Sequence, residues 1–194
     1  MLKLDKDFWS ERYDNNILGW DAGAITTPLK EYIDQLKRKD IEILIPGCGQ
    51  GHEARYLYDN GFTHVTIVDL VKKPIEELRQ YCSNWPDDHF IVSNFFDIKG
   101  QFDLIVEQTF FCALNPELRQ QYADKMYELL KPGGKLVGLL FNIDLPGDGP
   151  PFGGHRSEYL EYFKLFNIRT FETAYNSIKP RQGNELFINM VKPG

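Results

Sequence analysis

Two short apolar runs separated by one helix constrain the fold of this chain most strongly. The first run, residues 41–45, is rich in β-branched side chains and ends in the glycine-rich turn at residues 46–51. A helix is expected over residues 52–58, and the second run, residues 65–68, ends at Asp69. This order of strand, helix and strand predicts a β-α-β unit, in which the two strands run parallel.

The same alternation of apolar runs and helices continues along the chain. Strands are expected at residues 90–92, 102–106, 135–141, 167–174 and 185–191. A turn at residues 131–134 is expected to lead into the strand at residues 135–141. Apolar strands that alternate with helices require a sheet covered on both faces. We predict an α/β, doubly wound, Rossmann-like fold with a mostly parallel seven-stranded sheet. The last two strands lack a helix-length connection, so the terminal strand is expected to be antiparallel.

A chain of 194 residues is predicted to form a single domain with four parts. These are an N-terminal helical segment (1–40), a core (41–141), a loop (142–155) and a C-terminal helix and strand pair (156–194). The loop is rich in glycine and proline and follows the carboxyl end of a strand, where open α/β sheets bind ligands. A binding loop is therefore expected, and a solvated connector is the alternative.

Composition excludes several classes of protein. The 22 basic and 28 acidic residues give a net charge of −6, which disfavours a nucleic-acid partner. No run approaches the roughly 20 apolar residues of a membrane span, and the first residues do not resemble a secretory signal. The three cysteines are odd in number and widely separated, which fits neither a disulfide framework nor a metal site. We expect a cytoplasmic protein without a bound metal.

The glycine-rich turn and Asp69 together indicate a cofactor that contains a nucleoside. Glycine at positions 47, 49 and 51 allows the backbone to approach a ligand closely. Asp69 lies at the end of the second strand, 69 − 49 = 20 residues after Gly49, where a carboxylate accepts hydrogen bonds from both ribose hydroxyls. An ordinary turn residue at the strand end is the alternative for Asp69.

The spacing of the glycines distinguishes two such cofactors. Dinucleotide sites favour Gly-x-Gly-x-x-Gly, whereas this chain has Gly-x-Gly-x-Gly with His52 at the third dinucleotide position. S-adenosylmethionine carries no pyrophosphate and does not need that cradle. The spacing favours S-adenosylmethionine over a nicotinamide cofactor.

Five segments in one order resemble the class I S-adenosylmethionine-dependent methyltransferases. They are Ile45–Gly51, Val68–Asp69, Asn94–Asp97, Phe102–Ile105 and Leu130–Gly134. The Pro-Gly-Cys-Gly form of the first resembles the thiopurine S-methyltransferase family, and within it the plant-type thiol and halide methyltransferases. This narrower resemblance extends over nearly the whole chain, through Phe8–Trp9, Trp20–Gly23, Thr27–Leu29, Phe110–Leu114, Met126–Pro132 and Gly149–Phe152.

The resemblance implies a role for each of several residues. Residues 1–40 would form a lid in which Trp9, Tyr13 and Trp20 enclose the cofactor. Asp69 would hold the ribose, and the other cofactor contacts would be Gly47, Gly49, Phe96, Asp97 and Gln108. Glu107 would lie with Gln108 near the methionine end, and Phe110 and Phe152 would contact the acceptor substrate. The plant enzymes carry Trp in place of Tyr13 and Tyr in place of Phe152, and the second change removes a hydroxyl beside the acceptor.

Several of these residues have a simpler structural alternative. Trp9 and Tyr13 could pin an amphipathic helix to the core, and Glu107 could be a carboxylate that caps backbone N–H groups. His155, in the late loop, could act as a general base or be merely solvated. Cys48 and Cys112 are expected to be small buried hydrophobes.

The predicted reaction is in-line transfer of a methyl group from S-adenosylmethionine to a small, soft nucleophile such as a thiol. An ionised thiol needs no base, whereas an alcohol or amine would require His155, Glu107 or Asp21 to take a proton. The alternatives are a small-molecule O- or N-methyltransferase and a binding module that transfers no methyl group. Nucleic-acid methylation is disfavoured because Glu107–Phe110 lacks the Asn/Asp-Pro-Pro-aromatic pattern. The oligomeric state is left open.

Overall fold

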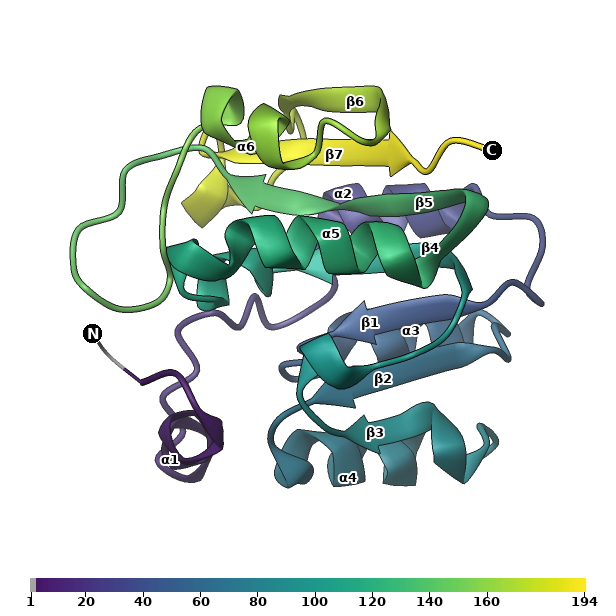
Figure 1. Ribbon diagram of the computed structural model, residues 1–194. Coiled ribbons are helices and arrows are strands. Elements are labelled where there is room, and N and C mark those ends of the chain that lie inside the picture. The colour runs from purple at the N-terminus through teal and green to yellow at the C-terminus, as the bar shows by residue number, and fades with distance from the viewer. Residues whose placement is uncertain (1–2) are drawn as a thin grey trace. The chain divides into compact units, whose positions relative to one another are not determined.

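The computed structural model describes residues 3–194, which form two compact units (Figure 1). The first unit comprises Lys3–Ile98 and the second begins at Lys99 and extends to the C-terminus. Each unit carries its own group of predicted site residues.

The first unit contains three parallel strands in the order β3-β2-β1. Ile43 pairs with Val65, and Ile67 with Phe90, so every strand runs in the same direction. The arrowheads of these strands point towards the side on which α1 lies (Figure 1). The elements are α1 (Lys6–Asp14), α2 (Thr27–Asp34), β1 (Ile43–Pro46), α3 (His52–Asp59), β2 (Val65–Asp69), α4 (Lys72–Tyr81) and β3 (Phe90–Val92).

Local sequence accounts for where these helices begin. Asp5 caps α1, because its carboxylate accepts a hydrogen bond from Phe8 N at 3.1 Å. Pro28 and Pro74 lie in the first turns of α2 and α4, where a missing N–H costs nothing. Ile33 of α2 and Leu78 of α4 are almost completely buried.

The second unit contains four strands in the order β4-β5-β7-β6. β4 and β5 are parallel, whereas β7 is antiparallel to both of its neighbours. The elements are β4 (Phe102–Gln108), α5 (Arg119–Leu129), β5 (Leu130–Phe141), α6 (Arg156–Tyr162), β6 (Asn167–Thr173) and β7 (Glu185–Val191), with a short 3-10 turn, η3 (Phe111–Ala113), after β4.

The predicted fold class is confirmed: α/β, with a mostly parallel sheet of seven strands within residues 3–194 and an antiparallel last strand. β5 begins at Leu130, before the predicted start at residue 135, so residues 131–134 lie within the strand and do not form a separate turn before it. They are an irregular part of it, because the register with β4 shifts between the pairs Phe102–Leu130 and Leu104–Lys135 and Gly133 has a φ of 78°. Gly133 N donates to Lys192 O at 2.9 Å, and Lys192 N donates to Gly134 O at 2.9 Å. Among the described residues, no helix has the length and apolar character needed to cross a membrane.

Candidate active site

The glycine-rich turn between β1 and α3 has three residues with positive φ. Gly47, Gly49 and Gly51 have φ values of 62°, 54° and 75°, a region that residues with a side chain rarely adopt. A Cβ atom on Gly51 would lie only 2.3 Å from a methyl carbon of Leu78. Gly51 is therefore needed for the close packing of α4.

Asp69 lies at the carboxyl end of β2, beside this turn. Its Oδ1 accepts a hydrogen bond from Val71 N at 2.9 Å, and its Oδ2 lies 3.6 Å from Cys48 Sγ. Burial raises the pKa of Asp69 to about 6, although hydrogen bonds from Val71, Cys48 and Gly49 act in the opposite direction. A carboxylate has about four acceptor positions, so Asp69 can accept further hydrogen bonds from a ligand.

Three aromatic side chains gather next to the glycine-rich turn. The Trp20 ring makes edge-to-face contacts with Trp9 and Tyr13, with ring centroids 5.7 and 5.5 Å apart. Trp20 also covers the turn, because a Cβ atom on Gly49 would lie 3.3 Å from the indole nitrogen. Burial, followed by the charge of Asp69, raises the pKa of Tyr13.

This arrangement brings six of the predicted cofactor residues together in the first unit: Trp9, Tyr13, Trp20, Gly47, Gly49 and Asp69. It is compatible with the predicted lid and also with the simpler alternative, in which the aromatic rings pin α1. Lys73 contributes to that attachment, since its Nζ donates to Tyr13 O at 3.3 Å.

Phe96 and Asp97 lie in the short 3-10 turn η2 (Phe95–Asp97) that follows β3. Asn94 caps this turn by accepting a hydrogen bond from Phe96 N at 3.1 Å. Phe95 is buried, whereas Phe96 is half-buried and Asp97 is exposed. Both of these predicted cofactor contacts therefore have surface available to a ligand.

Glu107 of β4 is the most enclosed carboxylate of the predicted site. Its side chain is 0% exposed, and its Oε1 accepts hydrogen bonds from Phe110 N at 2.7 Å and Phe111 N at 2.9 Å. Its Oε2 accepts a hydrogen bond from the buried hydroxyl of Tyr122. These contacts favour the structural alternative for Glu107 over the predicted role as a base.

Thr109 is a residue of this region that the sequence analysis missed. It has a φ of 59°, which is rare for a β-branched residue and costs about 1–3 kcal/mol. Glu107 helps to hold this conformation, because it binds the two N–H groups that follow Thr109. No local sequence signal predicts it, since threonine has no preference for a left-handed conformation.

The turn after Thr109 contacts the late loop. Phe152 N donates a hydrogen bond to Cys112 O at 2.7 Å, and Cys112 Sγ lies 3.3 Å from Thr109 O. Phe110 and Phe152, the predicted acceptor contacts, are both half-buried. Gln108, a predicted cofactor contact, is half-buried at the end of β4.

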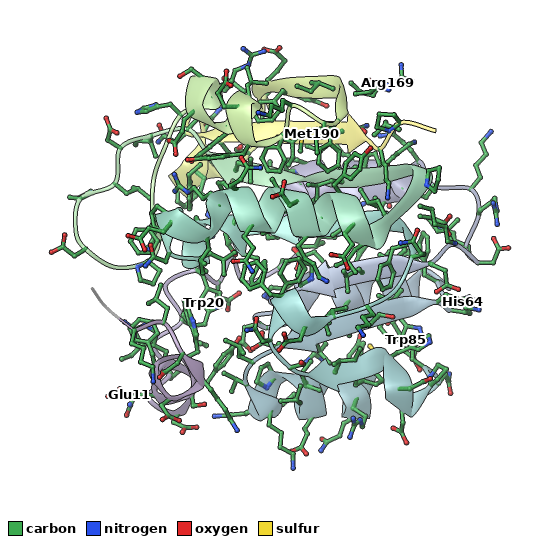
Figure 2. The ribbon with its side chains drawn as sticks, viewed as in Figure 1. Glu11, Trp20, His64, Trp85, Arg169 and Met190 are labelled. Atoms are coloured by element: carbon green, nitrogen blue, oxygen red, sulfur yellow. The ribbon has the colours of Figure 1, made fainter. Side chains whose placement is uncertain are left out.

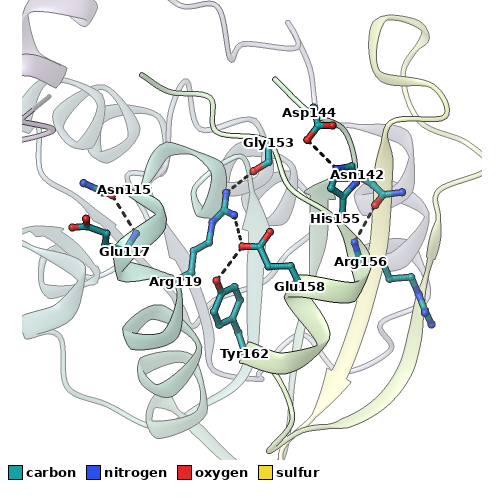
Figure 3. Close-up of polar contacts among 10 residues, drawn as sticks. All are labelled: Asn115, Glu117, Arg119, Asn142, Asp144, Gly153, His155, Arg156, Glu158 and Tyr162. Atoms are coloured by element: carbon teal, nitrogen blue, oxygen red, sulfur yellow. Dashed lines mark hydrogen bonds and ion pairs between the residues drawn. The ribbon is translucent and has the colours of Figure 1, made fainter. Parts of the chain in front are cut away.

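The base of the late loop is held closed by backbone and side-chain bonds. Ile143 and Gly154 exchange two backbone hydrogen bonds of 3.0 Å. Figure 3 shows Arg119 of α5 donating to Gly153 O at 2.7 Å and to Glu158 at 2.9 Å. Arg119, which the sequence analysis also missed, has a side chain only 3% exposed.

His155 lies at the end of this loop and points towards Asp144 (Figure 3). Its Nε2 is 2.9 Å from Asp144 Oδ1, and the histidine side chain is 51% exposed. A histidine so open to solvent, paired with an exposed carboxylate, fits the solvated alternative better than the predicted base.

The three cysteines are all buried and none forms a disulfide. Burial raises the pKa of Cys48 and of Cys112, and raises that of Cys82 to about 12, so the thiols stay protonated at neutral pH. Within residues 3–194 there is no group of three potential metal ligands.

Solved structures share this fold. The chain superposes on 1,6-didemethyltoxoflavin-N1-methyltransferase from Burkholderia thailandensis, solved with bound 1,6-didemethyltoxoflavin and S-adenosylhomocysteine, with a TM-score of 0.76. The alignment covers 97% of this chain and 87% of that one, at 21% identity. The fold is that of a class I S-adenosylmethionine-dependent methyltransferase.

Sequence comparison identifies the family. The family model of thiopurine S-methyltransferase matches residues 4–191, so the chain belongs to the thiopurine S-methyltransferase family and is an S-adenosylmethionine-dependent methyltransferase. It is 30% identical to probable thiol methyltransferase 2 of Arabidopsis thaliana over 91% of this chain and 81% of that protein. It is 31% identical to thiocyanate methyltransferase 1 of Brassica oleracea over 94% and 83%, respectively.

Proposed function

We propose that this protein transfers a methyl group from S-adenosylmethionine to a small thiol. The observation that carries the proposal is the group formed by the glycine-rich turn, Asp69 and the three aromatic rings around Trp20. The relatives named as thiol and thiocyanate methyltransferases support a soft nucleophile as the acceptor.

Each part of this group has a proposed task. Asp69 accepts hydrogen bonds from the ribose hydroxyls, and the glycine-rich turn lies against the cofactor. The faces of Trp9, Tyr13 and Trp20 suit a sulfonium cation and exclude water, which would otherwise solvate the attacking thiolate. Phe96 and Asp97 flank the adenine, and Gln108 contacts the methionine part.

Bound S-adenosylmethionine supplies an activated methyl group with its leaving group already attached. The protein therefore contributes mainly orientation and a dry environment. In-line attack forms a bond from the thiolate sulfur to the methyl carbon and breaks the bond from that carbon to the sulfonium sulfur.

The contacts of Glu107 and His155 support a reaction without a dedicated base. Glu107 already accepts three hydrogen bonds in a buried position, and His155 is open to solvent. A thiol whose pKa is near neutrality arrives partly ionised, so no protein group has to remove its proton. Glu107 then serves to position the turn that carries Phe110.

Phe110 and Phe152 are proposed to contact the acceptor. The hydrogen bond from Phe152 N to Cys112 O supports this pairing, because it attaches the late loop to the turn that follows Phe110. Neither ring carries a hydroxyl, so an acceptor that relies on apolar contact is favoured over one that needs a hydrogen bond here.

The proposed setting is the cytoplasm, with a small molecule as the partner and neither nucleic acid nor membrane. Support comes from the free cysteines and the net charge of −6, which suit a reducing compartment and repel a phosphate backbone.

Methyl transfer to a panel of acceptors tests the proposal. Purified protein is incubated with methyl-labelled S-adenosylmethionine and with small thiols, thiopurines, bisulfide, iodide, and matched alcohols and amines. We expect labelled thioethers, and at least about 100-fold less product from the Asp69→Ala variant. Product from alcohols or amines alone would contradict the thiol acceptor, and cofactor binding without any product would indicate a binding module.

A further inference from the structure

A short polar contact joins the loop that carries Trp20 to the start of α3. His52 Nε2 lies 2.6 Å from Asp21 Oδ1, and the two side chains are 25% and 26% exposed. The same Asp21 oxygen accepts a hydrogen bond from Gly23 N at 2.9 Å. One carboxylate therefore closes the turn at residues 21–23 and attaches that turn to α3.

The position of this pair in the chain links it to the glycine-rich turn. His52 directly follows Gly51, and Asp21 directly follows Trp20, whose indole covers Gly49. The Trp20 ring also contacts Trp9 and Tyr13, which belong to α1 in the same N-terminal segment. The Asp21–His52 pair thus joins this segment to the helix that the glycine-rich turn begins.

We propose that His52 is a positioning residue, which binds Asp21, holds the Trp20 indole over the glycine-rich turn and so slows dissociation of the adenosyl cofactor. The inference rests on the proposed function, because it requires the cofactor to bind at this turn. A cofactor bound at this turn would lie against the Trp20 indole, and the Asp21–His52 contact opposes the movement of the indole that would release it. A short charge-assisted contact between half-buried groups is stronger than a fully exposed ion pair.

The dissociation rate of S-adenosylhomocysteine tests the proposal, with His52→Ala as the variant. His64→Ala is the matched control, because His64 belongs to the same unit, binds its neighbour Thr63 at 2.9 Å and is exposed. His64 precedes β2, at the end opposite Asp69, and lies far from Trp20 in Figure 2. We expect the rate to rise about three- to tenfold in His52→Ala and to stay unchanged in His64→Ala.

A double-mutant cycle with Trp20→Ala separates positioning from a general loss of structure. If His52 acts through Trp20, His52→Ala has little further effect on the dissociation rate once the indole is absent. The proposal is overturned if the rate in His52→Ala equals that of the wild type. It is also overturned if the rate rises by the same factor with and without Trp20.

Asp21→Asn provides a second variant, and it decides the question if His52→Ala does not fold. Asparagine retains the oxygen that accepts the Gly23 N–H and removes the charge, so we expect an increase in dissociation rate of about threefold. An unchanged rate would overturn the proposal. Wild-type protein that fails to bind S-adenosylhomocysteine at all would refute the proposed function as well, whereas normal binding with unchanged variant rates refutes only the role of His52.

Discussion

Two carboxylates close to the carboxyl ends of strands differ in how far the protein already occupies them. Asp69, the last residue of β2, has one oxygen bound to Val71 N and the other 3.6 Å from Cys48 Sγ, and it also accepts from the backbone at Cys48 and Gly49. Glu107, the next-to-last residue of β4, is 0% exposed and accepts hydrogen bonds from two N–H groups and a phenol. Asp69 is only half-buried, so a ligand can still reach it, whereas Glu107 is fully enclosed and shapes the chain around it.

The turns after β1 and β4, which lie near these two carboxylates, differ in backbone strain. After β1, positive φ angles fall on glycines, which adopt them without strain. After β4, a positive φ falls on Thr109, and the cost is met by the bonds that Glu107 makes to the next two residues. A saturated carboxylate and a strained backbone therefore occur together, whereas the available carboxylate lies beside a relaxed turn.

Replacing Asp69 should have the largest effect, and the effect should be on binding. In Asp69→Ala we expect affinity for S-adenosylmethionine to fall at least about 100-fold, because two charge-assisted hydrogen bonds to the ribose are lost. The free energy of unfolding of the unliganded protein should not fall, since the raised pKa shows that the buried charge is costly. Calorimetric titration and urea unfolding measure the two quantities. A parallel loss of stability would give Asp69 the same structural role as Glu107.

Replacing Glu107 should have the opposite pattern. In Glu107→Gln we expect the free energy of unfolding to fall by about 2–4 kcal/mol, because an amide cannot replace a buried carboxylate that accepts three hydrogen bonds. Cofactor affinity of the folded protein should change by less than about threefold. The exposed Glu117 supplies a matched control, and Glu117→Gln should change stability by no more than about 0.5 kcal/mol. A strong loss of cofactor affinity in Glu107→Gln with normal stability would contradict the structural role assigned to Glu107.

Lowering the pH should weaken cofactor binding through Asp69. Its pKa of about 6 lies above the ordinary value of 3.8, so the unliganded native state takes up a proton more readily than the unfolded chain. As the pH falls from above 6 to below 3.8, the cost of the buried charge is relieved, and the contribution of Asp69 to stability increases.

Binding follows the reverse trend, because only the ionised carboxylate accepts from both ribose hydroxyls. We expect affinity to fall about tenfold between pH 7 and pH 5, as a pKa near 6 requires. Titration calorimetry at several pH values measures this change, with Asp69→Asn as the control that should remove it. An equal decrease in Asp69→Asn would assign the pH dependence to another group.

Thr109→Gly should have the smallest effect, and it should be favourable for stability. Glycine relieves the strain at a φ of 59° but adds freedom to the unfolded chain, so we expect a net gain of about 0.5–1 kcal/mol in urea unfolding. Asn16, with a φ of 54°, is the control, because asparagine tolerates this region and Asn16→Gly should gain less. Loss of stability in Thr109→Gly would show that the turn after β4 is not strained.

Local patterns were sufficient for much of the fold and part of the site. The β-α-β unit, the glycine-rich turn and the position of Asp69 follow from strand periodicity and from the need for glycine at positive φ. The resemblance to a known family added Trp9, Tyr13 and Trp20, which the structure brings together around the turn. The start of β5 was missed, because Pro132 and the two glycines after it indicate a turn, and their backbone bonds to the distant Lys192 are not visible in the local sequence.

The sequence by itself determined the alternation of strands and helices, because chain periodicity and turn chemistry act over a few residues. Only the tertiary structure decided which carboxylates remain available to a ligand. The role of Glu107 depends on a hydroxyl 15 residues away in Tyr122, and the Asp21–His52 contact joins residues 31 positions apart. Such partners meet only after packing of the elements brings them within hydrogen-bonding distance, and no local pattern encodes that distance.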